Sequence, residues 1–225
     1  MDHHIALQQG PGASSDSTSP VCGTVLVLEH KSVYTLGTGT QEGSGPFSRK
    51  LPDGSALTYD LFHVERAGEA TYHGPGQLVI YPILDLSHFD KDINKYLRGL
   101  EQVVIDSLAE IGIPSAGRIE GLTGVWVGDE KLAAIGIKLR RWVTMHGVSV
   151  NVCPDMRYFG NIVPCGIKDK GVGSIVTQPH CAQVSVADFA AIFLAKFCRQ
   201  FDATFSVENV LEGERGRMYI ESLCA

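Results

Sequence analysis

The stretch that decides the fold of this chain is Arg66-Ala67-Gly68-Glu69-Ala70-Thr71-Tyr72-His73-Gly74-Pro75-Gly76-Gln77, which runs directly into the apolar segment 78–86. Glycine and proline at this density are typical of a turn, because glycine permits positive φ angles and a close approach to the backbone. The same loop carries arginine, threonine, tyrosine and histidine side chains, which a plain turn does not need. A polar, glycine-rich loop that opens onto a buried strand predicts a ligand site.

The composition is that of an ordinary globular protein. The length of 225 residues suffices for one large domain or two small ones. Of these residues, 44% are hydrophobic and 20% are charged, as in soluble globular proteins. The net charge of −6 argues against nucleic acid as the main partner. No apolar run reaches the roughly 20 residues of a membrane span. We therefore expect neither nucleic acid nor a membrane as a partner.

The six cysteines contain no CxxC pair, so the sequence has neither a zinc knuckle nor a thioredoxin-type motif. We interpret them as thiols of a reducing compartment. The segment 1–20 lacks the features of a signal or transit peptide and is rich in Gly, Ser, Asp and Gln. We predict that 1–20 is disordered and that 21–225 forms a single catalytic domain.

Hydrophobic periodicity predicts an α+β fold with a mixed sheet. Helices are expected at 93–111 and 186–201, where apolar residues recur at three- and four-residue steps. Pro82 indicates an edge position or a bulge for its strand. Long loops are expected at 37–54 and 154–175. The expected strands are 24–29, 32–36, 60–65, 78–84 and a meander of 125–127, 131–138 and 143–151.

Cys165 stands between Pro164 and Gly166 in one of these loops, where a buried structural thiol is less expected. A thiol becomes a nucleophile when a nearby cation or base lowers its pKa. The candidates for that role are Lys131, Lys138, His73 and His146. None of them is close to Cys165 in sequence, and spacing alone does not choose among them.

Four blocks together resemble the lipoyl(octanoyl) transferase family, the octanoyltransferases of protein lipoylation. They appear in the family's order and spacing across roughly residues 22–205. The blocks are 66–77, Lys131-Leu132-Ala133-Ala134-Ile135-Gly136, His146-Gly147 with Asn151, and Pro164-Cys165-Gly166-Ile167. The resemblance implies the fold of the lipoate and biotin protein ligase catalytic domains. It also implies an enzyme without cofactors that passes octanoyl from octanoyl-acyl carrier protein to a lysine of a lipoyl domain.

The resemblance further implies a role for each matching residue. Cys165 would be the acyl-thioester nucleophile, Lys131 would lower its pKa, and no metal would be needed. One departure is Ala67, where the family usually has glycine; a methyl group there costs roughly 1 kcal/mol if φ is positive. The substrate channel would be lined by Arg66, Ala67, Gly68, Glu69, Ala70, Thr71, Tyr72, His73, Ala134, Ile135, Gly136, Gly147, Val148 and Ser149.

The energetics of thioesters support such a reaction. Exchange between two thioesters is nearly isoenergetic, and attack by a lysine amine then gives a more stable amide, so neither step needs ATP. Burial of each methylene contributes about 0.8 kcal/mol, which makes eight carbons sufficient for selection. Ile135 and Val148 are the apolar side chains expected to cover the acyl chain.

The implied acceptors are lipoyl domains of the glycine cleavage H protein and of 2-oxoacid dehydrogenase E2 subunits. We expect the basic cluster Lys138, Arg140 and Arg141 to lie near the channel mouth and to steer acidic partner proteins. The chain is expected to be a monomer in the cytoplasm, or in the plastid stroma or mitochondrial matrix of a eukaryote.

Three alternatives remain at this point. An ATP-dependent lipoate or biotin ligase would share the fold, but it needs a basic adenylate-binding loop, which 66–71 matches poorly, and it does not need Cys165. A hydrolase would pair Cys165 with His146 or His73. A non-catalytic acyl-binding module would keep the channel without turnover.

Overall fold

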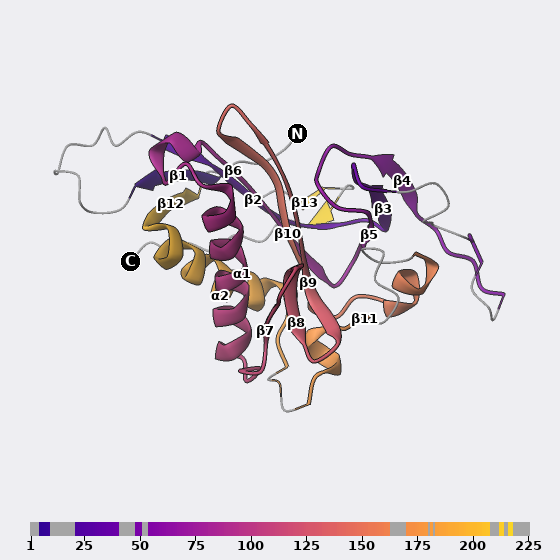
Figure 1. The fold of residues 1–225 in the computed structure, drawn as a ribbon. Coiled ribbons are helices and arrows are strands. Elements are labelled where there is room, and N and C mark those ends of the chain that lie inside the picture. The colour runs from indigo at the N-terminus through magenta and orange to yellow at the C-terminus, as the bar shows by residue number, and fades with distance from the viewer. Residues whose placement is uncertain are drawn as a thin grey trace.

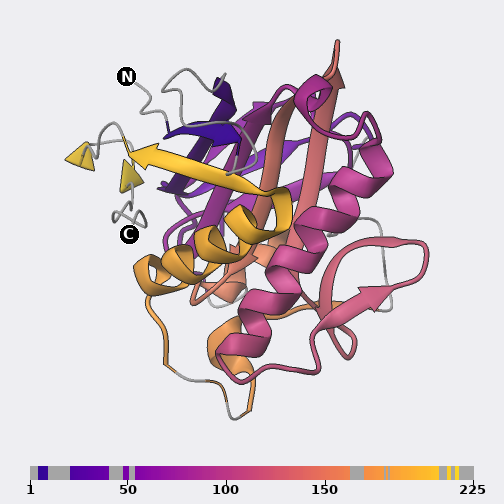
Figure 2. The same cartoon turned by 90° about the vertical axis from the view of Figure 1, so that its left-hand side faces the viewer.

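The computed structural model describes residues 5–9, 21–40, 48–50, 54–162, 170–179, 181, 183–207, 212–213 and 216–217. Within these residues, two helices cover one face of a large sheet, and a small second sheet stands on its other side (Figure 1). The helices are α1 (Ile93–Glu110) and α2 (Val186–Phe201), which pack against each other (Figure 2). No helix among the described residues is long and apolar enough to cross a membrane.

The large sheet has the strand order β12-β1-β2-β6-β10-β9-β8-β7, and neighbours along this path are antiparallel. Its strands are β12 (Ala203–Val207), β1 (Ile5–Gln9), β2 (Val21–His30), β6 (Gln77–Leu84), β10 (Val143–Asn151), β9 (Glu130–Arg140), β8 (Leu122–Val127) and β7 (Gly117–Ile119). The short strand β11 (Gly171–Val172) pairs in parallel with the start of β9, and β14 (Gly216–Arg217) pairs with β2 and with β13 (Glu212–Gly213).

The small sheet has the order β4-β3-β5. Its strands are β3 (Val33–Leu36), β4 (Asp60–His63) and β5 (Ala70–His73), and the pair β3·β4 is parallel. The remaining turns of helix are η1 (Leu86–His88), η2 (Met156–Asn161) and η4 (Ile175–Thr177). The predicted α+β fold with a mixed sheet is therefore confirmed.

Two cores result from these layers. The first lies between the large sheet and the helices, where residues such as Ile80 and Val148 meet Leu100 and Phe193. The second lies between the small sheet and η2, where Tyr72 stacks on Tyr158 with ring centroids 4.5 Å apart. The second core holds the glycine-rich stretch against the rest of the molecule.

The helices and the meander form where periodicity predicts them. Helix α1 begins after Asp92, whose carboxylate accepts hydrogen bonds from two N–H groups of the first turn, and α2 begins after Ser185 in a similar way. The segment 154–175, expected as a loop, contains η2 and β11 among its described residues. Most of the predicted loop 37–54, at 41–47 and 51–53, lies outside the described residues.

The N-terminal segment differs from the expectation of disorder at Ile5–Gln9, which form β1 between β2 and β12. Both edges of this backbone segment find hydrogen-bonding partners that are distant in sequence, and composition does not reveal such partners. The rest of 1–20 lies outside the described residues, so the division into 1–20 and 21–225 stays a prediction.

Pro82 does not lie on an edge strand, because β6 pairs with both β2 and β10. The ladder between β6 and β10 is instead interrupted near Pro82, which has no N–H to donate. The Thr144 hydroxyl fills the gap: it accepts from the Leu84 N–H at 2.9 Å and donates to the Pro82 carbonyl at 2.8 Å. A side chain thus replaces the missing backbone hydrogen bonds.

Candidate active site

A chain of buried hydrogen bonds joins the glycine-rich stretch to the meander. His73 Nδ1 lies 2.7 Å from Gln77 Oε1, and Gln77 Nε2 donates to Asn151 Oδ1 at 2.8 Å. Asn151 Nδ2 donates to the Gly173 carbonyl at 2.9 Å, and the Gly173 N–H donates to the Lys131 carbonyl at 3.1 Å. Because the amide oxygen of Gln77 only accepts, His73 is assigned the Nδ1–H tautomer. Three of the four blocks recognised in the sequence therefore meet through side chains and backbone.

His73 is neutral in this chain. Burial lowers the pKa of His73 to about 3, and the nearby His30 ring, 5.6 Å away between centroids, adds to the shift. Its second nitrogen faces the Thr35 hydroxyl at 3.5 Å, while that hydroxyl oxygen accepts from Arg66 Nη2 at 2.9 Å. With both nitrogens directed at neighbours, His73 holds the loop in place and has no free lone pair for proton transfer.

Arg66 fastens the loop through backbone carbonyls. Its Nη2 donates to the carbonyls of Thr35 at 2.9 Å and Glu69 at 2.8 Å, and its Nη1 donates to that of Ala67 at 3.2 Å. The Arg66 side chain is buried. The arginine at the start of the glycine-rich stretch therefore has a structural role, which is to hold the turn through these carbonyls. Gly68 has φ 92°, whereas Ala67 is not among the described residues with positive φ, so the methyl group at Ala67 causes no such strain.

The loop lies directly on β9. The Ala67 N–H donates to the Ile137 carbonyl at 3.0 Å, and a Cβ at Gly136 would come within 2.8 Å of the Ala67 carbonyl oxygen. Only glycine permits this approach of two backbones. The structure thus brings the first candidate channel segment, 66–68, onto the second, 134–136.

Strand register divides the other candidate lining residues between two faces. Ala134 lies opposite Ser149, and Gly136 lies opposite Gly147, so these four share one face of the sheet. Ile135 and Val148 form the row between them. That row faces the helices and belongs to the first core.

Ile135 and Val148 are therefore not placed to cover an acyl chain lying on Ala134 and Ser149. The alternation of side chains along a strand is the reason. In β5, Ala70 and Tyr72 are buried in the second core. Whether the candidate residues line an acyl channel stays a prediction.

Lys131 owes its orientation to a β-bulge. Trp126 pairs with Lys131, but Val125 pairs with Ala133, so Leu132 is an extra residue in β9. Leu132 and Ala133 both face the first core, and Lys131 consequently points to the opposite face, with Ala134. Its Nζ lies 4.7 Å from the centroid of the Trp126 ring, a cation–π contact. Strict alternation would have directed Lys131 into the core.

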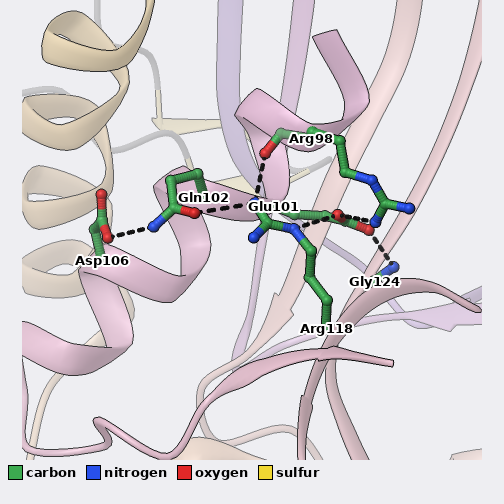
Figure 3. Close-up of polar contacts among 6 residues, drawn as sticks. All are labelled: Arg98, Glu101, Gln102, Asp106, Arg118 and Gly124. Atoms are coloured by element: carbon green, nitrogen blue, oxygen red, sulfur yellow. Dashed lines mark hydrogen bonds and ion pairs between the residues drawn. The ribbon is translucent and has the colours of Figure 1, made fainter. Parts of the chain in front are cut away.

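A buried carboxylate of α1 holds β8, the strand that pairs with the start of β9 (Figure 3). Glu101 of α1 is 1% exposed and accepts from Arg98 Nη1 at 2.7 Å, Arg118 Nε at 2.8 Å and the Gly124 N–H at 3.1 Å. Gly124 has φ 120°, and a Cβ there would lie 3.4 Å from Lys131 Cε. Helix, strand and lysine are thus connected through Gly124.

Cys165 lies outside the described residues, within 163–169, but the residues on both sides of that segment are placed. On one side, Asn161 bonds the Ser48 backbone through both atoms of its amide, at 2.8 and 2.7 Å, and Ile162 packs in the second core. On the other side, Lys170 Nζ lies 2.6 Å from Asp129 Oδ1, and the Gly171 N–H donates to the Asp129 carbonyl. The segment therefore ends beside the start of β9.

The other two residues considered as partners of Cys165, His146 and Lys138, are placed further along β9 and β10. His146 lies opposite Ile137, six residues along β9 from Lys131, and burial lowers the pKa of its imidazole. Lys138 forms an ion pair with Glu65.

Cys153 is an exposed free thiol, and partial burial raises its pKa, with Glu29 adding to the effect. Among the described residues, no group of His, Cys, Asp or Glu side chains is placed to hold a metal ion.

Gln77, Asn151 and Trp126 were not assigned roles from the sequence. Gln77 and Asn151 stand inside the recognised sequence blocks, which marked them as candidates. Their hydrogen bond, which joins the glycine-rich stretch to the meander, forms only because β6 pairs with β10. Trp126 carried no signal beyond an apolar position in a strand.

Comparison with known proteins identifies the class. The family model of the lipoyl protein ligase A/B catalytic domain matches residues 7–198. Among solved structures, a putative lipoate protein ligase from Thermoplasma acidophilum superposes with a TM-score of 0.61 at 16% identity, covering 78% of this chain and 70% of that one. At this identity the likeness concerns the fold. The chain belongs to the lipoyl protein ligase A/B catalytic-domain family.

Sequence relatives narrow the class further. The chain is 52% identical over 181 residues to an octanoyltransferase of Synechocystis, covering 76% of this chain and 77% of the relative. It is 47% identical over 188 residues to that of a Synechococcus strain, covering 79% and 70%. It is 46% identical over 160 residues to the chloroplastic octanoyltransferase LIP2p2 of Arabidopsis thaliana, with 71% of this chain covered but only 55% of the relative. Within the family, the chain groups with the octanoyltransferases and is an acyltransferase.

Proposed function

We propose that this acyltransferase moves an octanoyl group from octanoyl-acyl carrier protein to a lysine of a lipoyl domain, through a thioester on Cys165. The observation that supports this most directly is the position of Lys131. Its backbone is bonded to Gly173, and its ammonium lies on the face of β9 that is turned away from the helices. The segment that contains Cys165 ends beside it, at Lys170.

The chain length between Cys165 and the placed residue Lys170 is compatible with the proposed roles. Cys165 stands five residues before Lys170, and an extended chain of that length reaches at most about 17 Å. An ammonium close to the thiol favours the thiolate, which is the nucleophile. His146 of β10 pairs with Ile137, which lies six residues along β9 from Lys131, or ~20 Å at 3.3 Å per residue. His146 is therefore a poorer candidate for this role.

The reaction consists of two acyl transfers without a change of oxidation state. The Cys165 thiolate attacks the donor's thioester carbon, the new S–C bond forms, and the carrier thiolate leaves and takes up a proton. The acceptor lysine amine then attacks the acyl-enzyme, the C–N bond forms, and the Cys165 sulfur leaves while a proton is released from nitrogen. Neither step consumes ATP.

Two alternatives are less well supported. An ATP-dependent ligase shares the fold, but the sequence relatives described above are octanoyltransferases. A hydrolase with His73 as base conflicts with the hydrogen bonds that occupy both nitrogens of this ring. The lipoyl-domain acceptor is consistent with a solved relative in fold, described as a bi-partite lipoate protein ligase and its E2 lipoyl domain, at a TM-score of 0.61.

The test is intact mass spectrometry after incubation with octanoyl-acyl carrier protein in the absence of ATP. We expect the mass of one octanoyl group on the wild type and on Cys153→Ala, none on Cys165→Ala, and its loss when a lipoyl domain is added and becomes octanoylated. An adduct that persists on Cys165→Ala would reject the thioester assignment. An adduct released only as free octanoate would indicate a hydrolase.

The compartment and the oligomeric state stay predictions. The chloroplastic relative is consistent with the plastid stroma as one of the expected compartments. A monomer is expected, and sedimentation of the purified chain would test it.

A further inference from the structure

The turn between β9 and β10 contains an unusual pair of residues. Arg140 pairs with Val143, which leaves Arg141 and Trp142 as a two-residue hairpin loop. Both have positive φ, 53° and 69°, as a type I′ turn requires. Such turns favour Asn-Gly, because side chains with a Cβ are disfavoured in the left-handed region, and a bulky aromatic residue there is an outlier. The turn therefore carries residues that its own geometry does not favour.

The same residues form an exposed basic and apolar tip, which we define as residues 140–143. The side chains of Trp142 and Val143 are 39% and 36% exposed, two of the few large exposed hydrophobic residues among those described. Arg140 and Arg141 are exposed, and neither forms an ion pair within the described part of the chain. Figures 1 and 2 show the hairpin extending beyond its neighbouring strands.

The tip is held in place by backbone contacts. The Leu86 N–H donates to the Trp142 carbonyl at 2.7 Å, and the backbones of Asp85 and Val143 form an isolated antiparallel β-bridge. The Asp85 carboxylate accepts from Ser87, and Lys138 is paired with Glu65, so these neighbouring charges are engaged. Of the expected cluster, Arg140 and Arg141 form no ion pair among the described residues, and Arg140 only adds to the effect of Lys138 in lowering the pKa of Glu65. Arginine and tryptophan are the residue types that contribute most at protein interfaces.

We propose that the tip is a docking surface for the acyl donor, an acidic carrier protein that presents an apolar patch beside its charges. This inference rests on the proposed function. Two arginines on a chain of net charge −6 select an acidic partner, and the exposed tryptophan selects a protein surface rather than a small anion. Backbone strain retained at an exposed position, where Asn-Gly would remove it, indicates that the side chains serve a purpose other than folding.

The distance to Lys131 favours the donor over the acceptor. Arg140 lies nine residues along β9 from Lys131, about 30 Å at 3.3 Å per residue. A carrier protein presents its acyl group on a long phosphopantetheine arm and can dock away from the reacting carbon. An acceptor lysine projects only a short distance from its own domain, so that domain must contact the rim of the site.

The test is the double variant R141N/W142G, which installs the favoured turn. Octanoyl transfer to a saturating lipoyl domain is measured with two donors, octanoyl-acyl carrier protein and octanoyl-pantetheine, which lacks the protein. We expect Tm to rise by about 2–4 °C, because the strain is relieved. We expect kcat/KM with the carrier protein to fall at least about tenfold and to become less salt-dependent. With octanoyl-pantetheine, kcat/KM should be unchanged.

A matched control is Arg199→Asn, which removes one positive charge from the exposed end of α2 and should change neither donor's kcat/KM. If R141N/W142G transfers from the carrier protein as fast as the wild type, the docking surface is refuted. An equal fall with both donors also overturns the proposal, since the tip would then act on the acceptor or on the site itself. If the wild type transfers from neither donor, the proposed function itself has failed.

Discussion

At the scale of single residues, the candidate site combines one cation with a buried neutral network. Lys131 is oriented by a bulge and by the Trp126 ring, while His73, Gln77 and Asn151 hold the surrounding strands together without charge. This division of roles gives separate predictions for the lysine and for the histidine.

Lys131→Met should shift the pH dependence of Cys165 alkylation to higher pH. Loss of a nearby ammonium destabilises the thiolate, and the expected shift is about 1–3 pH units. Lys131→Arg keeps the charge and should shift the curve less, although the guanidinium fits the site differently. The measurement is site-resolved alkylation across pH by mass spectrometry. Cys153 in the same sample is the control, and superimposable Cys165 curves would assign Lys131 a purely structural role.

His73 should make the fold sensitive to acid. Its pKa is about 3 in the folded chain, against 6.5 for the free side chain, so only the unfolded state binds this proton between these values. The free energy of unfolding therefore falls as pH drops through this window, by up to about 1.4 kcal/mol per pH unit. His73→Asn keeps a donor for Gln77 but cannot titrate, so it should be less stable at pH 8 and lose less stability between pH 6.5 and 5. Urea unfolding at each pH measures this; parallel pH profiles would contradict it.

At the scale of secondary structure, α1 is tied to β7 and β8 by one carboxylate. Glu101 accepts three hydrogen bonds in a position with almost no solvent contact (Figure 3). The helix is thereby fixed against Gly124, on which the Lys131 side chain rests. Correct orientation of the lysine thus depends on helix packing several residues away.

Glu101→Gln should lower the free energy of unfolding by about 1.5–3 kcal/mol, because charge-assisted hydrogen bonds in a buried site are lost. Asp106→Asn on the exposed face of the same helix is the matched control and should change it by no more than about 0.5 kcal/mol. Denaturant unfolding of both variants is the measurement. Equal stability of the two would show that the arginines, without the carboxylate, suffice to hold β7.

At the scale of the whole molecule, segments from both ends of the chain meet in the sheet. β1 pairs with β2 on one side and with β12, which follows α2, on the other. The candidate site lies on other strands, chiefly the start of β9 and its neighbours. We therefore expect the pairing of β1 with β2 and β12 to contribute to the stability of the fold and not to the transfer reaction.

Deletion of residues 1–9 should lower Tm while leaving kcat for octanoyl transfer unchanged. The deletion removes several backbone hydrogen bonds from two strands, an effect of about 2 kcal/mol, or about 4–8 °C at this chain length. Calorimetry together with the transfer assay makes the test. An unaltered Tm would restore the initial expectation that this segment is disordered.

The amino-acid sequence by itself determined the positions of the helices, the meander and the family. Helical and alternating periodicities are local, as are the caps at Asp92 and Ser185, so they can be recognised without tertiary contacts. The four blocks likewise named Lys131 and Cys165 as the candidate pair.

Only the tertiary structure decided which face each site residue occupies. The bulge at Leu132 turned Lys131 out of the core, and strand register placed Ile135 and Val148 in it. Pro82 lies in a central strand because Thr144, distant in sequence, supplies the missing hydrogen bonds. Each of these outcomes depends on pairing between segments far apart in the chain, and the free energy of such pairing is not encoded in either segment alone.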